Sequence, residues 1–171
     1  GLARTYVGDL QAGDAAYGVL FGAVFTGLAA GIALGPKVFA QFSRRRLFGA
    51  SLAIAGVLLL ILSLLQNLVL AIFIVVILGA FSGISWVTGF TMVGMEVNDE
   101  MRGRVFAFIQ SLIRISLVAV LAIAPLVAAA VGEHIFNIGG AMLTYNGAAF
   151  TMFGGGFIAA AVGIISYQQM K

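Results

Sequence analysis

The sequence contains no cysteine, one histidine and very few charged residues, and each shortage excludes a class of protein. Without cysteine, the chain has no disulfide framework, no thiol nucleophile and no thiolate metal site. Charged residues make up 9% of the 171 residues, whereas a soluble domain usually carries about a quarter. A water-soluble surface of ordinary size therefore cannot be assembled from this chain.

Recognisable catalytic motifs are also missing. The sequence has no HExxH zinc motif, no GxSxG nucleophile elbow and no P-loop. The single histidine, His134, stands beside Glu133 in a polar connection, where we expect it to be solvated. We therefore expect no catalytic residue, no metal site, no cofactor and no enzymatic activity in these residues.

Hydrophobic residues, in contrast, make up 62% of the chain, and its mean hydropathy is +1.14. They form five long stretches, at about 15–40, 47–65, 68–93, 105–131 and 148–167. Each stretch supplies the ~20 residues that a helix needs to cross ~30 Å of hydrocarbon. Lipid offers the backbone no hydrogen-bond partner, so such segments must be helical. The sequence predicts one all-α domain over residues 1–171, a polytopic bundle of five transmembrane helices surrounded by a lipid bilayer.

Positive charges fall almost entirely in every second connection between these stretches. On one side of the predicted membrane lie Lys37, Arg44, Arg45, Arg46, Arg102, Arg104 and Lys171. The opposite side carries only Arg4. Basic residues mark the cytoplasmic side, so the N-terminus is predicted outside and the C-terminus in the cytoplasm. The net charge of +3 and the pI near 9.7 therefore indicate topology, and no nucleic-acid partner is expected.

Small residues recur at four-residue intervals within three of the stretches. The rows are Gly27, Gly31 and Gly35, then Gly79 and Gly83, then Gly155, Ala159 and Gly163. Such rows let membrane helices approach closely, which predicts helix packing at these positions. The alternative is that glycine is simply common in membrane spans. The connection Gly132–Gly147 is rich in glycine and asparagine, and its composition predicts an irregular, mobile loop.

Arg114 is the one charged residue inside a predicted span. It lies about two helical turns past the membrane entry, where an unpaired cation costs several kcal/mol. We expect it to be buried against protein or a water-filled cavity, with Gln110 on the same helix face. Two roles remain open: an ion pair with Glu96, or contact with a cavity and substrate. Snorkelling of the side chain to the cytoplasmic surface is a third, structural alternative.

Trp86 forms a second polar and aromatic group within the third stretch, together with Ser82 and Ser85. Tryptophan is usually found at the membrane interface, but this one lies deep in its stretch. The group is therefore a candidate cavity lining, along with Gln110 and Arg114.

Two segments resemble loops of the major facilitator superfamily of transporters. GIALGPKVFAQFSRRRLFG, from Gly31 to Gly49, is similar to the loop between helices 8 and 9, although Ala40 stands where that loop usually has an aspartate and Ser43 replaces its usual glycine. A charge latch that depends on this aspartate therefore lacks its usual acidic residue here. EVNDEMRGRVFAF, beginning at Glu96, resembles the loop between helices 10 and 11 in the branch that includes enterobactin-type exporters.

This resemblance implies that the five spans are helices 8 to 12, the C-terminal half of a bacterial plasma-membrane transporter. Such a half would export an unknown small molecule by alternating access, with the missing N-terminal half as its partner. The cytoplasmic loops would fasten and release the two halves by ion pairs. The residues assigned to this role are Arg44, Arg45, Arg46, Asp99, Glu100, Arg102 and Arg104.

A narrower resemblance gives the alternative function. RRRLFG, EVNDEMRGRVFAFIQSLIRISLV and the terminal SYQQMK look like the transporter portion of actinobacterial proteins in which a transporter-like domain precedes a thymidylate kinase. In that case the chain is a membrane anchor or regulatory domain. The kinase would then lie beyond Lys171.

Overall fold

The computed structural model describes residues 10–65, 67–131, 133–138 and 141–169. Five helices account for most of them: α2 (Leu10–Val38), α3 (Arg44–Leu64), α4 (Leu68–Glu96), α5 (Asp99–Val131) and α6 (Gly147–Gln169). Each is long and apolar enough to cross a membrane. The five predicted helices are therefore confirmed, with ends that differ from the expected ones by a few residues.

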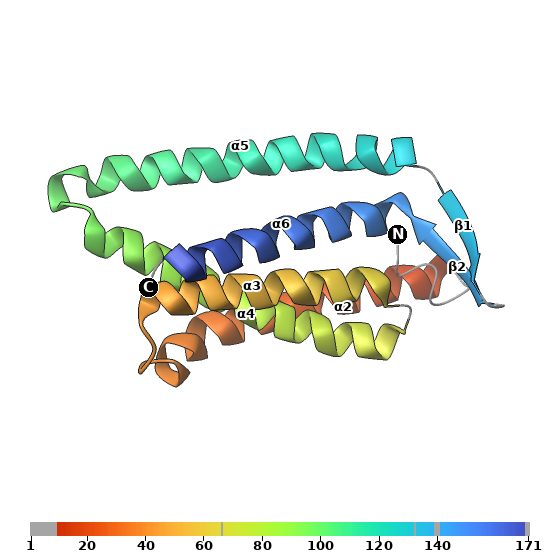
Figure 1. Ribbon diagram of the computed structural model, residues 1–171, viewed down its shortest axis with the longest axis horizontal. Coiled ribbons are helices and arrows are strands. Elements are labelled where there is room, and N and C mark those ends of the chain that lie inside the picture. Colours follow the sequence, from red (N-terminus) through yellow and green to blue (C-terminus); the bar gives the residue numbers. More distant parts are fainter. Residues whose placement is uncertain (1–9, 66, 132, 139–140, 170–171) are drawn as a thin grey trace.

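The helices run roughly side by side along the long axis of the molecule (Figure 1). Helix α2 packs against α4, α3 packs against both α4 and α6, and α5 makes its main helix contacts with α6. Helix α5 therefore lies at the edge of the bundle. Among its residues with described exposure, none is buried.

Glycine brings α2 and α4 into backbone contact. A Cβ atom at Gly27 would collide with the backbone carbonyl of Val76, and one at Gly31 with that of Ala80. From the other helix, a Cβ at Gly83 would meet the carbonyl oxygen of Leu28. Close approach of this kind gives dispersion contacts to helices that have no hydrophobic driving force for association in lipid. The predicted rows that include Gly35 and Gly79 thus lie at this helix–helix interface.

A second close interface joins α3 to α6. A Cβ atom at Gly156 would lie 3.0 Å from the carbonyl oxygen of Gly56, and one at Gly163 would collide with Ala53. Among the α6 residues with described exposure, the buried ones are Gly156, Ala160 and Gly163. The predicted row began at Gly155, which is exposed, so the contact face begins one residue later than the sequence suggested.

The connection between α5 and α6 differs from the prediction. An irregular loop was expected over Gly132–Gly147, but β1 (Glu133–Ile138) pairs with β2 (Ala141–Asn146) as an antiparallel hairpin. The strands are rich in the aromatic and β-branched residues that favour a pleated backbone. The two residues between them in the sequence are both glycine, which tight hairpin turns favour. Apart from this hairpin, the described chain is helical throughout its long elements, as predicted.

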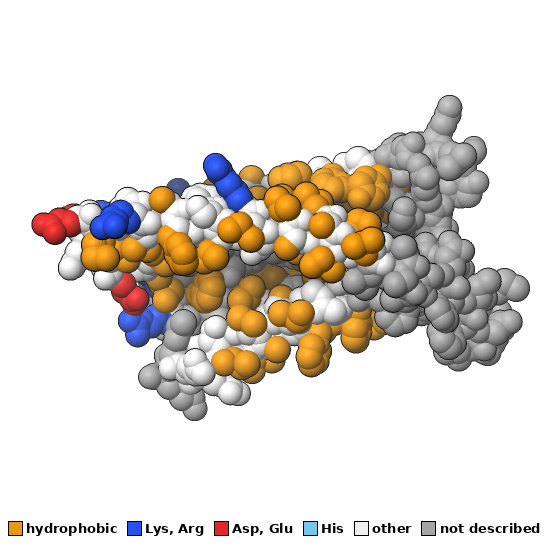
Figure 2. All heavy atoms as spheres, turned by 90° about the horizontal axis from the view of Figure 1, so that it is seen from above, with side chains coloured by type: hydrophobic (Ala, Val, Ile, Leu, Met, Phe, Trp, Pro, Cys, Tyr) orange, Lys and Arg blue, Asp and Glu red, His pale blue; other side chains and the backbone are white. Residues whose placement is uncertain are grey.

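Most of the large apolar side chains lie on the outside of the bundle. Val69, Phe73 and Leu126 are each more than 60% exposed. Figure 2 shows hydrophobic side chains along the length of one face, while most charged side chains in that view gather at one end. The buried positions are mainly small residues such as Ala71. The bundle thus turns its bulky apolar groups outward, the reverse of a soluble protein.

Candidate functional site

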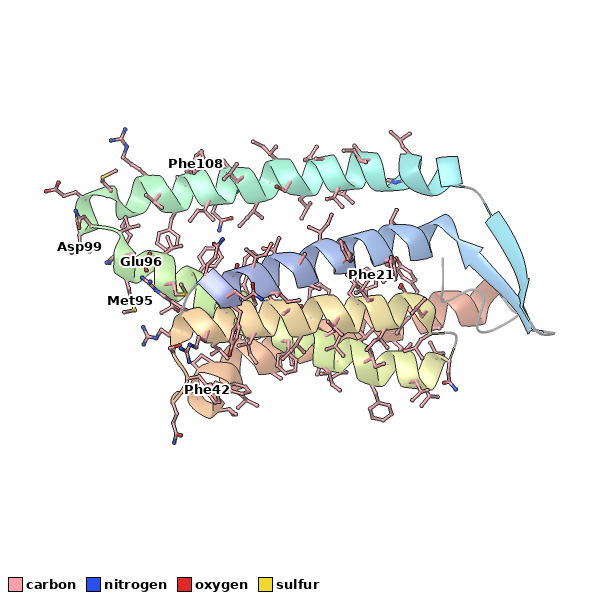
Figure 3. The ribbon with its side chains drawn as sticks, viewed as in Figure 1. Phe21, Phe42, Met95, Glu96, Asp99 and Phe108 are labelled. Carbon is pink, nitrogen blue, oxygen red and sulfur yellow. The ribbon has the colours of Figure 1, made fainter. Side chains whose placement is uncertain are left out.

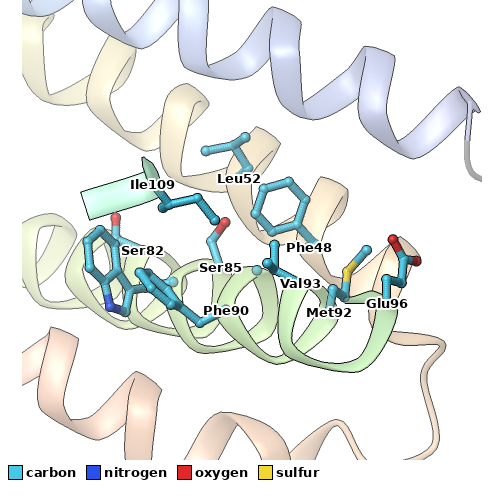
Figure 4. A pocket seen from close by; sticks show the side chains of 11 residues that line it. Phe48, Leu52, Ser82, Ser85, Phe90, Met92, Val93, Glu96 and Ile109 are labelled. Carbon is cyan, nitrogen blue, oxygen red and sulfur yellow. The ribbon is translucent and has the colours of Figure 1, made fainter. Parts of the chain in front are cut away.

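A cavity of about 430 Å³ lies between α3, α4 and α5 (Figure 4). Apart from Ser82, Ser85 and the carboxylate of Glu96, its lining is apolar or aromatic, and most of it comes from one face of α4. The lining residues are Phe48, Leu52, Ser82, Ser85, Trp86, Gly89, Phe90, Met92, Val93, Glu96 and Ile109. The volume falls within the range of pockets that bind small organic molecules.

Aromatic rings join the wall of this cavity to α5. The rings of Trp86 and Phe90 lie 5.0 Å apart, and Phe90 stacks on Phe106 of α5 at 5.8 Å with an interplanar angle of 13°. Offset ring pairs of this kind hold helices together and also offer flat apolar faces. Trp86 itself is half exposed, so part of its ring remains open to a ligand.

The cavity contains two serine hydroxyl groups, those of Ser82 and Ser85. Ser85 is only 6% exposed. Other buried serines, such as Ser51 and Ser63, donate to backbone carbonyls of their own helix. Within the described chain, the structure shows no hydrogen bond from the Ser85 side chain. A buried hydroxyl without a partner is destabilising unless a ligand or water supplies one.

The three candidate cavity residues from the sequence do not lie together. Trp86 is in the lining with Ser82 and Ser85, whereas Gln110 and Arg114 lie outside it. The α5 residue that reaches the cavity is Ile109. Neighbouring residues of a helix point about 100° apart, so Gln110 is turned away from the same space. Apolar lining residues such as Ile109 were missed because nothing in the sequence distinguishes them from lipid-facing ones.

Arg114 is exposed, and it forms no hydrogen bond or ion pair with the described residues. The expected burial is therefore not found within this chain. Glu96, its expected partner, instead accepts from Arg45 at 2.6 Å. Glu96 ends α4, whereas Arg114 lies fifteen residues beyond Asp99, the first residue of α5. That separation is roughly 22 Å along the helix axis, beyond the reach of either side chain.

The charged residues of the two predicted cytoplasmic loops gather at one end of the helices. Besides the Arg45–Glu96 pair, Arg102 contacts Asp99 at 2.9 Å across one turn of α5. Figure 3 shows Glu96 and Asp99 at this end, with Met95 close by. Glu100 and Arg104 are exposed here too. Within the described residues, no acidic or histidine side chains form a group able to hold a metal ion.

Comparison of the chain with protein-family models, curated proteins and solved structures finds no match. The activity, partner and substrate that the family resemblance implies therefore have to be argued from the residues and geometry described above.

Proposed function

We propose that this chain is part of a multi-pass bacterial membrane transporter and handles a small, mostly apolar molecule. The observation that carries the proposal is the apolar cavity with the buried, unpartnered hydroxyl of Ser85. Such a site suits a ligand with an apolar body and one hydrogen-bonding group. Trp86 offers its ring face to that body, and Ser85 offers a hydrogen bond to the polar group.

Insertion into the plasma membrane is supported by the apolar exterior of the helices. Residues such as Val69, Leu70 and Phe73 are each more than half exposed along α4. An apolar surface that runs the length of the bundle needs lipid or protein to cover it. The placement of the basic residues at one end supports an outside N-terminus and a cytoplasmic C-terminus.

The proposal that a second half of the transporter packs against this chain is supported by the polar face of α5. Gln110, Ser111 and Arg114 are all exposed on one side of this helix. An arginine facing hydrocarbon is costly, so this side needs a protein or aqueous neighbour. In the proposed assembly, the N-terminal half of the transporter covers this side of α5. The charged loop residues then fasten and release the two halves.

The alternative function, a membrane anchor or regulator for a downstream thymidylate kinase, needs neither a ligand nor the cavity. In both functions these residues carry no catalytic activity of their own. Transport requires an open cavity and anchoring does not, so the effect of filling the cavity distinguishes the two functions.

Efflux of a lipophilic dye from cells that produce the full-length protein tests the proposal. Ser85→Leu fills the cavity and is expected to lower the efflux rate at least tenfold at normal protein levels. Phe73→Leu is the control, because Phe73 is 65% exposed on the same helix and does not line the cavity. The isolated chain in liposomes should give no flux above empty vesicles. Flux by the isolated chain, or normal efflux by Ser85→Leu, would contradict the proposal.

A further inference from the structure

An open recess of about 850 Å³ lies at the charged end of the bundle, between the connection from α2 to α3 and the last turn of α4. Three consecutive arginines, Arg44 to Arg46, line it together with Phe42 and Met95. Only one carboxylate, that of Glu96, lies among its lining residues. The recess therefore carries an excess of two positive charges.

The hydrogen bonds at the recess leave two guanidinium groups without an anion. Arg45 is paired with Glu96 at 2.6 Å. Arg44 donates to the thioether sulfur of Met95, which is a weak acceptor and carries no charge. Arg46 has no hydrogen bond or ion pair to the part of the chain that the structure describes. Guanidinium groups bind phosphate through paired, charge-assisted hydrogen bonds.

Exposed apolar groups adjoin these arginines. Phe42 is 61% exposed and Met95 67% exposed, and both line the recess. The position of the recess along the predicted membrane normal also favours a lipid headgroup, because α3 begins at Arg44 and α4 ends at Glu96. The recess thus lies where two predicted spans leave the hydrocarbon, at the level of lipid headgroups. A soluble phosphate compound would make no use of the apolar groups.

We propose that this recess binds the headgroup of an anionic phospholipid of the cytoplasmic leaflet. The phosphate lies between the guanidinium groups of Arg44 and Arg46, and the glycerol and first acyl carbons lie against Phe42 and Met95. A zwitterionic lipid binds more weakly, because its cationic group meets an already positive recess. This inference rests on the proposed membrane insertion, but not on transport.

Native mass spectrometry of the full-length protein in detergent, titrated with phosphatidylglycerol or phosphatidylcholine, measures the binding. The double variant Arg44→Gln with Arg46→Gln is expected to weaken phosphatidylglycerol binding roughly 25-fold. Each arginine near the membrane surface contributes a factor of about five, and the two factors multiply. Arg102→Gln with Arg104→Gln is the matched control. It removes the same charge at the same end, but neither residue lines the recess. The control is expected to change the binding less than threefold.

Equal weakening by both pairs would show that only the general surface potential matters and would overturn the proposal. Displacement of phosphatidylglycerol by inorganic phosphate at equal concentration would overturn the lipid assignment. If the glutamine pair fails to insert, Arg46→Gln alone, with an expected fivefold loss, gives the same test. Because binding is measured without transport, equal binding of phosphatidylglycerol and phosphatidylcholine by the unsubstituted protein, together with intact dye efflux, refutes this site and leaves the proposed function standing.

Discussion

At the scale of single residues, the position of Glu96 along the helix axis determines which arginine it pairs with. Glu96 and Arg45 lie at the same end of neighbouring helices and form an exposed pair, with side chains 58% and 62% accessible. Arg114 lies several turns further along α5 and has no partner among the described residues. The loop arginine is therefore paired within the described chain, whereas the arginine inside the candidate span is not.

Double-mutant cycles distinguish these two arginines. Combining Arg45→Gln with Glu96→Gln is expected to give a coupling free energy of about 0.2–1 kcal/mol, the usual value for an exposed ion pair. The matched cycle of Arg114→Gln with Glu96→Gln should give a coupling near zero. The measurement is the free energy of unfolding in mixed detergent micelles. A larger coupling for Arg114 than for Arg45 would contradict the observed pairing.

At the scale of helices, glycine decides which faces meet. Gly31 lies against the backbone of α4, whereas Gly22 on the same helix has nothing within 4 Å of a Cβ atom. Small-residue spacing alone does not separate these two positions. The α6 contact face, which begins at Gly156 and not at Gly155, makes the same point. Four-residue spacing of small residues identifies helices that are able to pack closely. Which of these small residues form the contact depends on the position of the neighbouring helix.

Substitution of these glycines tests the helix interface. Gly31→Leu is expected to lower the free energy of unfolding by about 1–3 kcal/mol, because the new side chain must push α2 and α4 apart. Gly22→Leu is the control, with the same gain in helix propensity and an expected change within about 0.5 kcal/mol. Both are measured by unfolding in mixed micelles. Equal losses for the two variants would show that the α2–α4 contact does not contribute in this way.

At the scale of the whole molecule, the charged end and the hairpin lie at opposite ends of the helices (Figure 1). The connection from α2 to α3 is at the charged end, and β1 and β2 are at the other. The apolar exterior between these ends supports the proposed lipid contact, and the exposed polar side of α5 supports the proposed protein neighbour.

Labelling of introduced cysteines tests the orientation of this bundle. Because the sequence has no cysteine, Tyr145→Cys and Ser43→Cys each introduce a single reactive site in this chain. In intact cells, an impermeant maleimide should label Tyr145→Cys, in the hairpin, and leave Ser43→Cys unlabelled. After the cells are opened, both should react. The reverse pattern in intact cells would overturn the proposed orientation.

The sequence by itself determined the five helices and the end at which the charges gather. Hydrophobic length and the distribution of basic residues are properties of each segment, and they need no knowledge of its neighbours. The need of Arg114 for a polar environment is likewise a local property, and it follows from the cost of a charge in hydrocarbon.

Only the tertiary structure decided which faces meet, which residues line the cavity and which arginine pairs with Glu96. In a sequence this apolar, lipid-facing and protein-facing residues have the same chemistry, so Ile109 could not be distinguished from its exposed neighbours. The partner of Glu96 depended on the axial positions of two helices that are distant in sequence. The hairpin depended on pairing between two strands, each too short to be identified beside five dominant helices.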